Sequence, residues 1–195
     1  MPAIPMPAIE LWAASAATRA ARCLWLVAAS TALALAPAPA SAQTMHRSPH
    51  MEETANIVGL KGGVVNSFNK EGHAVGGGFS LFYERNLIPG WLEIEAASSA
   101  AWIENETVIE LDVFAKKPFH ANEVVNPYLG LGPNVSIIIA PQETRTRFGI
   151  HATAGSYFWF GGDAWALDVE VLYLMLFGDN LTHDFTVEVG PAFRF

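Results

Sequence analysis

The residues of this sequence that could do chemistry are acids and bases that alternate with aliphatic residues. In residues 108–113 (VIELDV) both acids occupy even positions, and residues 165–171 (WALDVEV) and 185–189 (FTVEV) repeat that pattern. Residues 92–95 (LEIE) show it with the opposite parity. Successive side chains of a β-strand point to opposite faces. Each stretch therefore predicts a strand with one apolar and one charged face.

The charged face is the candidate functional site, and it carries more acids than bases. Its predicted members are Lys61, Glu84, Glu93, Glu95, Glu110, Asp112, Lys116, Arg147, Asp168, Glu170, Glu188 and Arg194, with His151 beside them. Charges taken out of bulk water must be paired or hydrated, because isolated ones are very costly. The simplest interpretation is a network of ion pairs and water. The excess of acids leaves a narrow, cation-favouring pore open as an alternative.

Catalytic and metal-binding patterns are weak. His151 and Thr153 are two residues apart, a spacing at which an imidazole on one strand face can reach a hydroxyl group. The loop that follows offers no obvious orienting acid, so a hydrogen bond from His151 to a carboxylate is the expected role. His46 and His50 are four residues apart but flank Ser48-Pro49 in a polar segment. We expect no catalytic residue, no metal site and no cofactor.

The alternating segments predict eight strands. Their expected ranges are 55–66, 73–85, 90–103, 106–117, 127–140, 147–160, 164–177 and 185–195, with turn signals between them that include residues 141–146 and 178–184. Such long strands suit a tilted crossing of a membrane, which needs about 9–11 residues. The predicted fold class is all-β: an eight-stranded antiparallel up-and-down transmembrane β-barrel.

One connection does not fit that prediction well. Residues 118–126 (PFHANEVVN) form the longest connection and would face the periplasm, where turns are normally short. The strand count and the orientation are therefore least secure at this point.

The two faces differ in a way that favours a membrane barrel over a soluble, lipocalin-like one. The polar face is rich in small residues, which a narrow barrel interior needs: Gly76, Gly78, Ser80, Gly130, Gly132, Asn134, Gly149, Thr153 and Gly155. The apolar face carries aromatic residues towards the strand ends, where interfacial girdles form: Phe79, Tyr83, Trp102, Phe158, Phe160, Trp165, Phe177, Phe193 and Phe195. Trp91, Tyr157 and Trp159 have the inward parity.

The first 42 residues predict a cleavable signal peptide. Arg19 and Arg22 precede a short apolar stretch, and Ala40-Ser41-Ala42 provides a small-residue cleavage site. We expect a signal peptide at 1–42, a polar lead-in at 43–54 and a barrel at 55–195. The one cysteine, Cys23, would be removed with the signal.

Composition excludes two classes of protein. Hydrophobic residues make up 51% and charged residues 15%, which is too apolar for a disordered chain. The net charge of -8 leaves no basic patch for nucleic acid.

Three stretches resemble a known family: residues 127–132 (PYLGLG), 149–155 (GIHATAG) and 189–195 (VGPAFRF). They are similar to the outer-membrane β-barrel superfamily that includes OmpA- and OmpX-like proteins. The resemblance implies that the barrel-assembly machinery reads the C-terminal strand. The residues that match this assembly signal are Phe185, Val187, Val189, Phe193 and Phe195, with Pro191 as a departure.

The resemblance also bears on activity. Lipid A deacylases of this superfamily place a histidine and a serine on strand seven, where residues 172–175 (LYLM) contain neither. We therefore expect a monomeric, non-enzymatic protein of the cell outer membrane that contacts outer-membrane lipid and acts in envelope structure or surface interaction. The alternatives are a lipid A-modifying enzyme, a small cation-favouring pore and a soluble, lipocalin-like periplasmic binding barrel.

Overall fold

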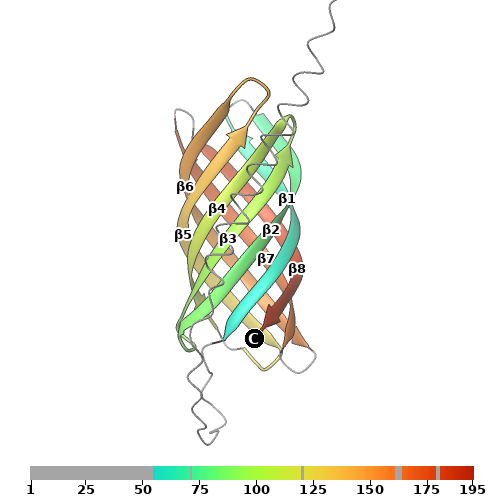
Figure 1. Ribbon diagram of the computed structural model, residues 1–195, viewed down its shortest axis with the longest axis vertical. Coiled ribbons are helices and arrows are strands. Elements are labelled where there is room, and N and C mark those ends of the chain that lie inside the picture. The colour runs from blue at the N-terminus through green and yellow to red at the C-terminus, as the bar shows by residue number, and fades with distance from the viewer. Residues whose placement is uncertain (1–54, 71, 120, 161–163, 179–180) are drawn as a thin grey trace, which may run out of the picture. The chain divides into compact units, whose positions relative to one another are not determined.

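Eight antiparallel strands close into a single barrel in the computed structural model, which describes residues 55–70, 72–119, 121–160, 164–178 and 181–195 (Figure 1). The strands are β1 (Asn56–Asn69), β2 (Gly72–Ile88), β3 (Leu92–Ile103), β4 (Glu106–Pro118), β5 (Val125–Ile139), β6 (Thr144–Phe160), β7 (Trp165–Phe177) and β8 (Thr182–Arg194). Each strand pairs with the next, and β8 pairs with β1. The predicted strand number and antiparallel order are confirmed. The expected signal peptide and lead-in lie outside the described residues.

Two predicted strand starts are wrong by three residues. β6 begins at Thr144 and not at 147, and β8 begins at Thr182 and not at 185. Both starts lie in segments interpreted as turns because they are polar. Pairing with a neighbouring strand decides them: Thr144 pairs with Ile139, and Thr182 pairs with Leu176.

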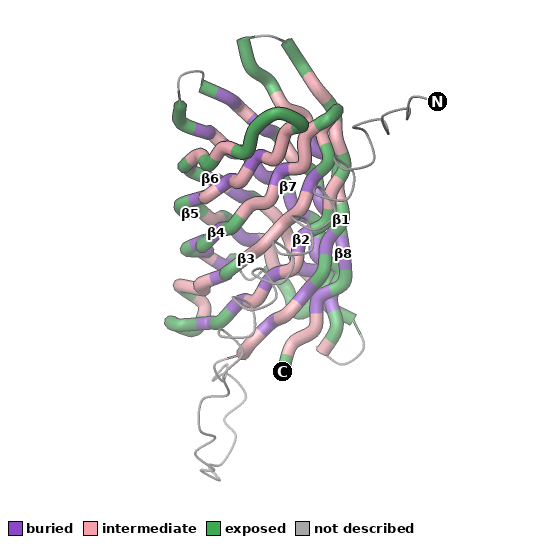
Figure 2. The backbone as a smooth tube through the Cα atoms, turned by 45° about the horizontal axis from the view of Figure 1, so that its top comes forward, coloured by how far each residue is buried: buried purple, intermediate pink, exposed green. Residues whose placement is uncertain are grey.

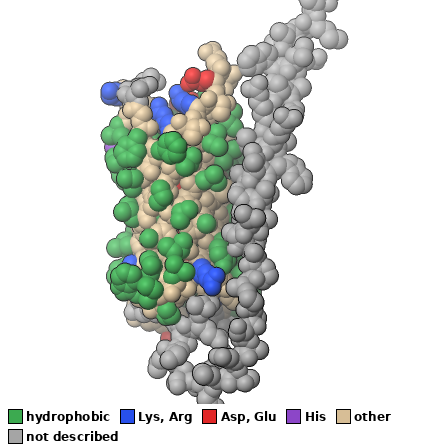
Figure 3. Space-filling view, turned by 60° about the vertical axis from the view of Figure 1, so that its left-hand side comes forward, with side chains coloured by type: hydrophobic (Ala, Val, Ile, Leu, Met, Phe, Trp, Pro, Cys, Tyr) green, Lys and Arg blue, Asp and Glu red, His purple; other side chains and the backbone are tan. Residues whose placement is uncertain are grey.

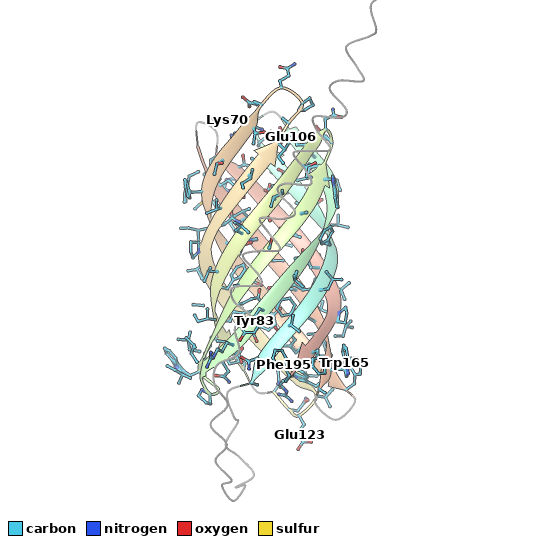
Figure 4. All side chains as sticks on the ribbon, in the orientation of Figure 1. Lys70, Tyr83, Glu106, Glu123, Trp165 and Phe195 are labelled. Carbon is cyan, nitrogen blue, oxygen red and sulfur yellow. The ribbon has the colours of Figure 1, made fainter. Side chains whose placement is uncertain are left out.

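The connection between β4 and β5 remains the longest, although it shortens to residues 119–124 because β5 begins at Val125. The strand count was therefore not the cause of its unusual length. This connection lies at the same end of the barrel as the C-terminus, as the labels of Glu123 and Phe195 show (Figure 4). We call this end, where Asn56 and Phe195 exchange backbone hydrogen bonds of 2.9 and 3.1 Å, the terminal end. The end that carries Lys70 and Glu106 is the opposite end.

Burial alternates along most of the strands, as the sequence pattern predicts, and most regularly along β7 (Figure 2). In β7, Ala166, Asp168 and Glu170 are buried, whereas Trp165 and Leu167 are exposed. An eight-stranded barrel is wide enough only for its own side chains, so the inward side chains pack together and shield one another from water. The charged face is therefore the inner wall and the apolar face is the outer wall.

Hydrophobic side chains cover the outer wall, and the charged side chains visible in Figure 3 lie near its ends. Large aromatic residues form two bands. Those towards the terminal end are Tyr83, Phe158, Phe160, Trp165, Phe193 and Phe195, and those towards the opposite end are Phe68, Phe79, Trp102, Phe148 and Phe177 (Figure 4). The expected outward aromatic residues all face outward. Among the described residues, no helix has the length and hydropathy needed to span a bilayer.

The interior of the terminal half is also packed with apolar and aromatic side chains. The cluster contains Ile57, Phe82, Tyr128, Tyr157, Trp159, Ala166 and Ala192. Tyr157 and Trp159 are buried, as their parity predicts, whereas Trp91 lies in the β2–β3 turn and is 58% exposed. Gly59 makes room for Phe82: a Cβ at this position would overlap the Phe82 ring and lie 2.9 Å from the carbonyl oxygen of Pro191.

Gly59→Ala should destabilise the barrel, because the inserted methyl group has no space beside the fully buried Phe82 ring. Overpacking of this kind costs about 1–3 kcal/mol in the free energy of unfolding. Urea unfolding of the barrel in detergent micelles measures it. Gly62→Ala is the matched control on the same strand, because the nearest atom to its new Cβ is the Gly78 carbonyl oxygen at 3.8 Å. Equal stability of the two variants would contradict the packing described here.

Candidate functional site

The structure places all the predicted charged-face residues on the inner wall. Lys61, Glu84, Glu95, Asp112, Lys116, His151, Asp168, Glu170 and Glu188 are buried. Glu93, Glu110, Arg147 and Arg194 are partly buried. The parity of each strand explains this placement, because side chains at alternate positions of a strand share one face. A shift of one residue would turn all of them to the other face.

Lys116 is the centre of the charge network in the terminal half. Its ammonium group lies 2.6 Å from a carboxylate oxygen of Glu95 and 2.9 Å from one of Glu84. The same ammonium group lies 3.8 Å from the centre of the Tyr128 ring. The hydroxyl group of Tyr157 donates to Glu84 at 3.1 Å. Lys116 is completely buried, so ionic and cation–π contacts replace its lost hydration.

Lys61 on β1 is the centre of a second group of acids, which lies farther from the terminal end than the Lys116 centre does. Its ammonium group pairs with Glu170 and lies 3.5 Å from Asp168 and 3.9 Å from Glu188. It also lies 4.6 Å from the centre of the Phe82 ring. Lys61 is 2% exposed, so these contacts must carry its charge.

Hydroxyl groups join and complete the two lysine centres. Tyr128 donates to Asp168 at 2.7 Å and so connects the Lys116 centre to the Lys61 centre. Ser80 donates to Glu188 at 2.8 Å, and Thr153 donates to Glu170. A carboxylate has several acceptor positions, and these donors fill positions that one lysine cannot reach.

Towards the opposite end, Asp112 is bonded by an imidazole and an amide group. His151 Nδ1 lies 2.9 Å from Asp112 Oδ1, and the Asn134 amide donates to the same oxygen at 2.8 Å. The sequence-based expectation that His151 bonds to a carboxylate matches this contact. Thr153 bonds to Glu170 instead of His151, so the described structure does not join His151 and Thr153 as base and nucleophile.

The partly buried members lie nearer the rims. Arg147 donates to the Thr182 hydroxyl at 3.0 Å, and Ser99 donates to Glu110 at 3.0 Å. The guanidinium group of Arg194 lies 4.2 Å from the centre of the Trp159 ring. These contacts extend the network to both ends of the barrel.

The lysine-centred layer fills the interior. Phe82, Glu84, Glu95, Lys116, Tyr128, Asp168 and Glu170 are each 2% exposed or less. A cavity of about 30 Å³ remains between this layer and the opposite end, with Ser80, Ser99, Glu110, Asp112, His151 and Glu188 in its wall. That volume holds about two water molecules. Among the described residues, no three His, Cys, Asp or Glu side chains converge to hold a metal ion.

The predicted list of interior residues contained only charged residues and His151, and it therefore missed several other buried side chains. Phe82, Phe114 and Tyr128 are almost completely buried, and their parity would have placed them inside. Asp184 is also buried, and it was missed because β8 was expected to begin at residue 185. Glu106 and Arg145 also occupy inward positions, at the rim of the opposite end. The inward positions of the described strands therefore hold ten acids and five bases, instead of the predicted eight and four.

No protein-family model and no curated protein matches the chain. Among solved structures, it is similar to Neisserial surface protein A (NspA), with a TM-score of 0.63 and 16% identity over 73% of this chain and 100% of that chain. It is similar to Ail, the attachment invasion locus protein of Yersinia pestis, with a TM-score of 0.57 and 18% identity over 74% of this chain and 100% of that chain. It is also similar to the N-terminal β-barrel domain of Pseudomonas aeruginosa OprF, with a TM-score of 0.52 and 14% identity over 73% of this chain and 100% of that chain.

These similarities establish the fold. The chain has the architecture of the small eight-stranded outer-membrane barrels. The predicted resemblance to the OmpA- and OmpX-like barrels is confirmed for the fold.

Lys116→Met should destabilise the barrel strongly, because it leaves Glu84 and Glu95 buried without their shared cation. Removing one partner of a buried ion pair costs about 3–5 kcal/mol in the free energy of unfolding. Urea unfolding in micelles measures the loss. The triple variant Lys116→Met, Glu84→Gln, Glu95→Gln should recover most of it, since no uncompensated charge remains.

Lys70→Gln provides the matched control, because Lys70 is an exposed lysine in the β1–β2 turn. It should leave the free energy of unfolding within about 0.5 kcal/mol of the unchanged protein. If Lys116→Met and Lys70→Gln have the same effect, the lysine-centred network does not stabilise the barrel.

Proposed function

We propose that this chain is a non-enzymatic protein of the cell outer membrane, with a plugged barrel that acts in envelope structure or surface interaction. One observation carries the proposal: the outer wall is apolar with an aromatic band near each end, while all the charged residues of the described strands except Arg85 and Lys117 face inward. A closed barrel satisfies its backbone hydrogen bonds within itself, so it can enter hydrocarbon with such a wall.

The soluble, lipocalin-like alternative requires the opposite distribution. A soluble barrel of that kind keeps its apolar side chains inside to hold a ligand. Here Leu131, Phe148 and Val187 face outward and are 58%, 65% and 44% exposed, whereas the interior is charged and filled. Exposed apolar surface on this scale would drive aggregation in water.

The orientation follows from the position of the chain ends. An exported chain reaches the outer membrane from the periplasm, and carrying the polar segment at 43–54 through hydrocarbon is costly, so the end where β1 begins stays on the periplasmic side. Asn56 and Phe195 meet at the terminal end. We therefore assign the terminal end to the periplasm and the short hairpins of the opposite end to the exterior. The signal peptide at 1–42 would supply the export step.

The C-terminal strand has the features expected of an assembly signal. Phe185, Val187, Val189 and Phe195 are exposed on the outer wall, and Phe193 is partly buried beside them. A row of apolar side chains on one face of β8 suits recognition by the barrel-assembly machinery before the barrel closes. Pro191 lies in the same row and lacks a backbone donor. It pairs with Leu167 of β7, and the pairing of β8 with β1 is interrupted between Val189 and Ala192, where the missing donor falls.

The interior supports a plug over a pore or an enzyme. Conduction needs a continuous aqueous pathway, and the layer around Lys61 and Lys116 fills the barrel. Hydrolysis needs a base beside its nucleophile at an accessible surface, but the His151 and Thr153 side chains are buried and bond to different acids.

The ion pairs at the opposite end bear on the kind of surface partner that the barrel could bind. Ail was solved in complex with the heparin analogue sucrose octasulfate. In the present chain, Arg145 at the opposite end is already paired with Glu106 at 2.8 Å and Glu143 at 3.2 Å. An arginine paired with two acids does not favour binding to a polyanion, so contact with lipid or with another envelope component fits better.

Two readouts test the proposed function on one preparation, provided that its gel mobility changes on boiling, as expected of a folded barrel. In a planar bilayer, the barrel should give no stable unitary conductance steps, because the lysine-centred layer blocks the interior. Lipid A from cells with and without the protein should carry the same acyl chains. Stable conductance steps would establish the pore instead, and a lost acyl chain would establish the enzyme.

A further inference from the structure

The outer wall carries charge at one place only. Within the described strands, no Asp or Glu occupies an outward position, and Arg85 on β2 and Lys117 on β4 are the only outward Lys or Arg residues. Both lie near the terminal end, two strands apart with β3 between them. Within the strands that the structure describes, this pair of cations therefore has no outward acid beside it.

Strand register brings these two cations within reach of one small anion. Arg85 pairs with Ile94, and Ile94 pairs with Ala115, so these three residues form a row across β2, β3 and β4. Lys117 follows Ala115 by two residues towards the terminal end. With strands about 4.8 Å apart and a rise of about 3.3 Å per residue, the two Cα atoms are roughly 12 Å apart. The two side chains are long enough to reach one small anion between them, and the Lys117 ammonium group lies at the β2–β3 turn, beside Gly90 and Trp91.

The donors of this pair are largely unused. Among the described residues, no hydrogen bond or ion pair involves the Arg85 guanidinium group, which has five N–H donors. The Lys117 ammonium group donates once, to the Gly90 carbonyl oxygen at 2.8 Å, and keeps its other two donors. Phosphate oxygens are the acceptors that such cations bind best.

Aromatic and apolar side chains complete the surroundings expected for a lipid. The Trp91 ring is 58% exposed and lies 5.9 Å from the Lys117 ammonium group, at the level where indoles occupy the membrane interface. Between Ile94 and Trp102, the outward side chains of β3 are all small, namely Ala96, Ser98 and Ala100. Their cross-strand partners are large: Tyr83, Leu81 and Phe79 on β2, and Val113, Leu111 and Ile109 on β4. An acyl chain fits between these two rows.

We propose that Arg85 and Lys117, with Trp91, form a binding site for the phosphate group of one anionic phospholipid in the periplasmic leaflet. An acyl chain of that lipid lies along the small residues of β3. The inference rests on the proposed insertion into the membrane and on the orientation given above. It adds a specific lipid class and a specific location to them.

The test uses the barrel folded into vesicles of phosphatidylcholine that contain phosphatidylglycerol as the minor lipid. Protein is released in mild detergent, and native mass spectrometry identifies the lipids that stay bound. The unchanged protein should retain phosphatidylglycerol above its share in the vesicle. A cation near a membrane surface contributes about fivefold to anionic lipid binding, so Arg85→Gln with Lys117→Gln should lower this enrichment about twenty-five-fold.

Lys70→Gln is the matched control, because it removes one cation at the opposite end and should leave the enrichment unchanged. If the double variant does not insert, Arg85→Gln and Lys117→Gln are compared singly, each with an expected fivefold loss. Enrichment that survives these substitutions, an equal loss in Lys70→Gln, or no enrichment in the unchanged protein overturns the site. A second vesicle series contains lipid A, and retention of lipid A through Arg85 and Lys117 would overturn the assignment to a phospholipid.

Failure of this inference is distinct from failure of the proposed function. A protein that inserts and shows the heat-dependent gel shift without lipid preference retains its proposed function and loses the site. A protein that never inserts contradicts both.

Discussion

The ion pairs made by the two buried ammonium groups of Lys61 and Lys116 are the interaction on which the rest of the barrel depends. Between them they contact Glu84, Glu95, Asp168, Glu170 and Glu188 inside a space only a few side chains wide. Neither lysine can be hydrated by bulk water there, and none of the carboxylates can be moved outward without entering the apolar wall. The network therefore requires each strand to keep its register.

The same constraint explains the small and aromatic residues of the interior. A lysine ammonium group surrounded by carboxylates leaves little width for other side chains, so Gly130 lies against the Lys116 stem and Thr153, and Gly155 lies against the Tyr128 ring. Tyrosines occupy the remaining space because each supplies a π-face to a cation and a hydroxyl donor to an acid. The result is a sealed layer, which supports a structural or contact role over transport.

The sequence was sufficient to predict the strand number, the parity of each strand and the direction in which the charges point, because period-two alternation encodes the faces directly. It could not give the ion-pair partners. Lys61 and Glu170 are separated by more than a hundred residues, and their contact depends on the curvature of the closed sheet. Strand starts such as Thr144 and Thr182 were missed for a related reason: threonine suits both turns and strands, and only the partner strand decides. Missing the start of β8 also removed Asp184 from the predicted network.

The most direct test of the central claim is depth-resolved quenching of single tryptophans by lipids brominated in their acyl chains. Two variants each keep one tryptophan, either Trp165, which is 47% exposed on the outer wall, or Trp159, which is 5% exposed inside. In vesicles, the account predicts strong quenching of Trp165 and little or none of Trp159, because only the outer wall meets lipid. Quenching of Trp159 with Trp165 unaffected would mean that the faces are reversed, and the account would be wrong.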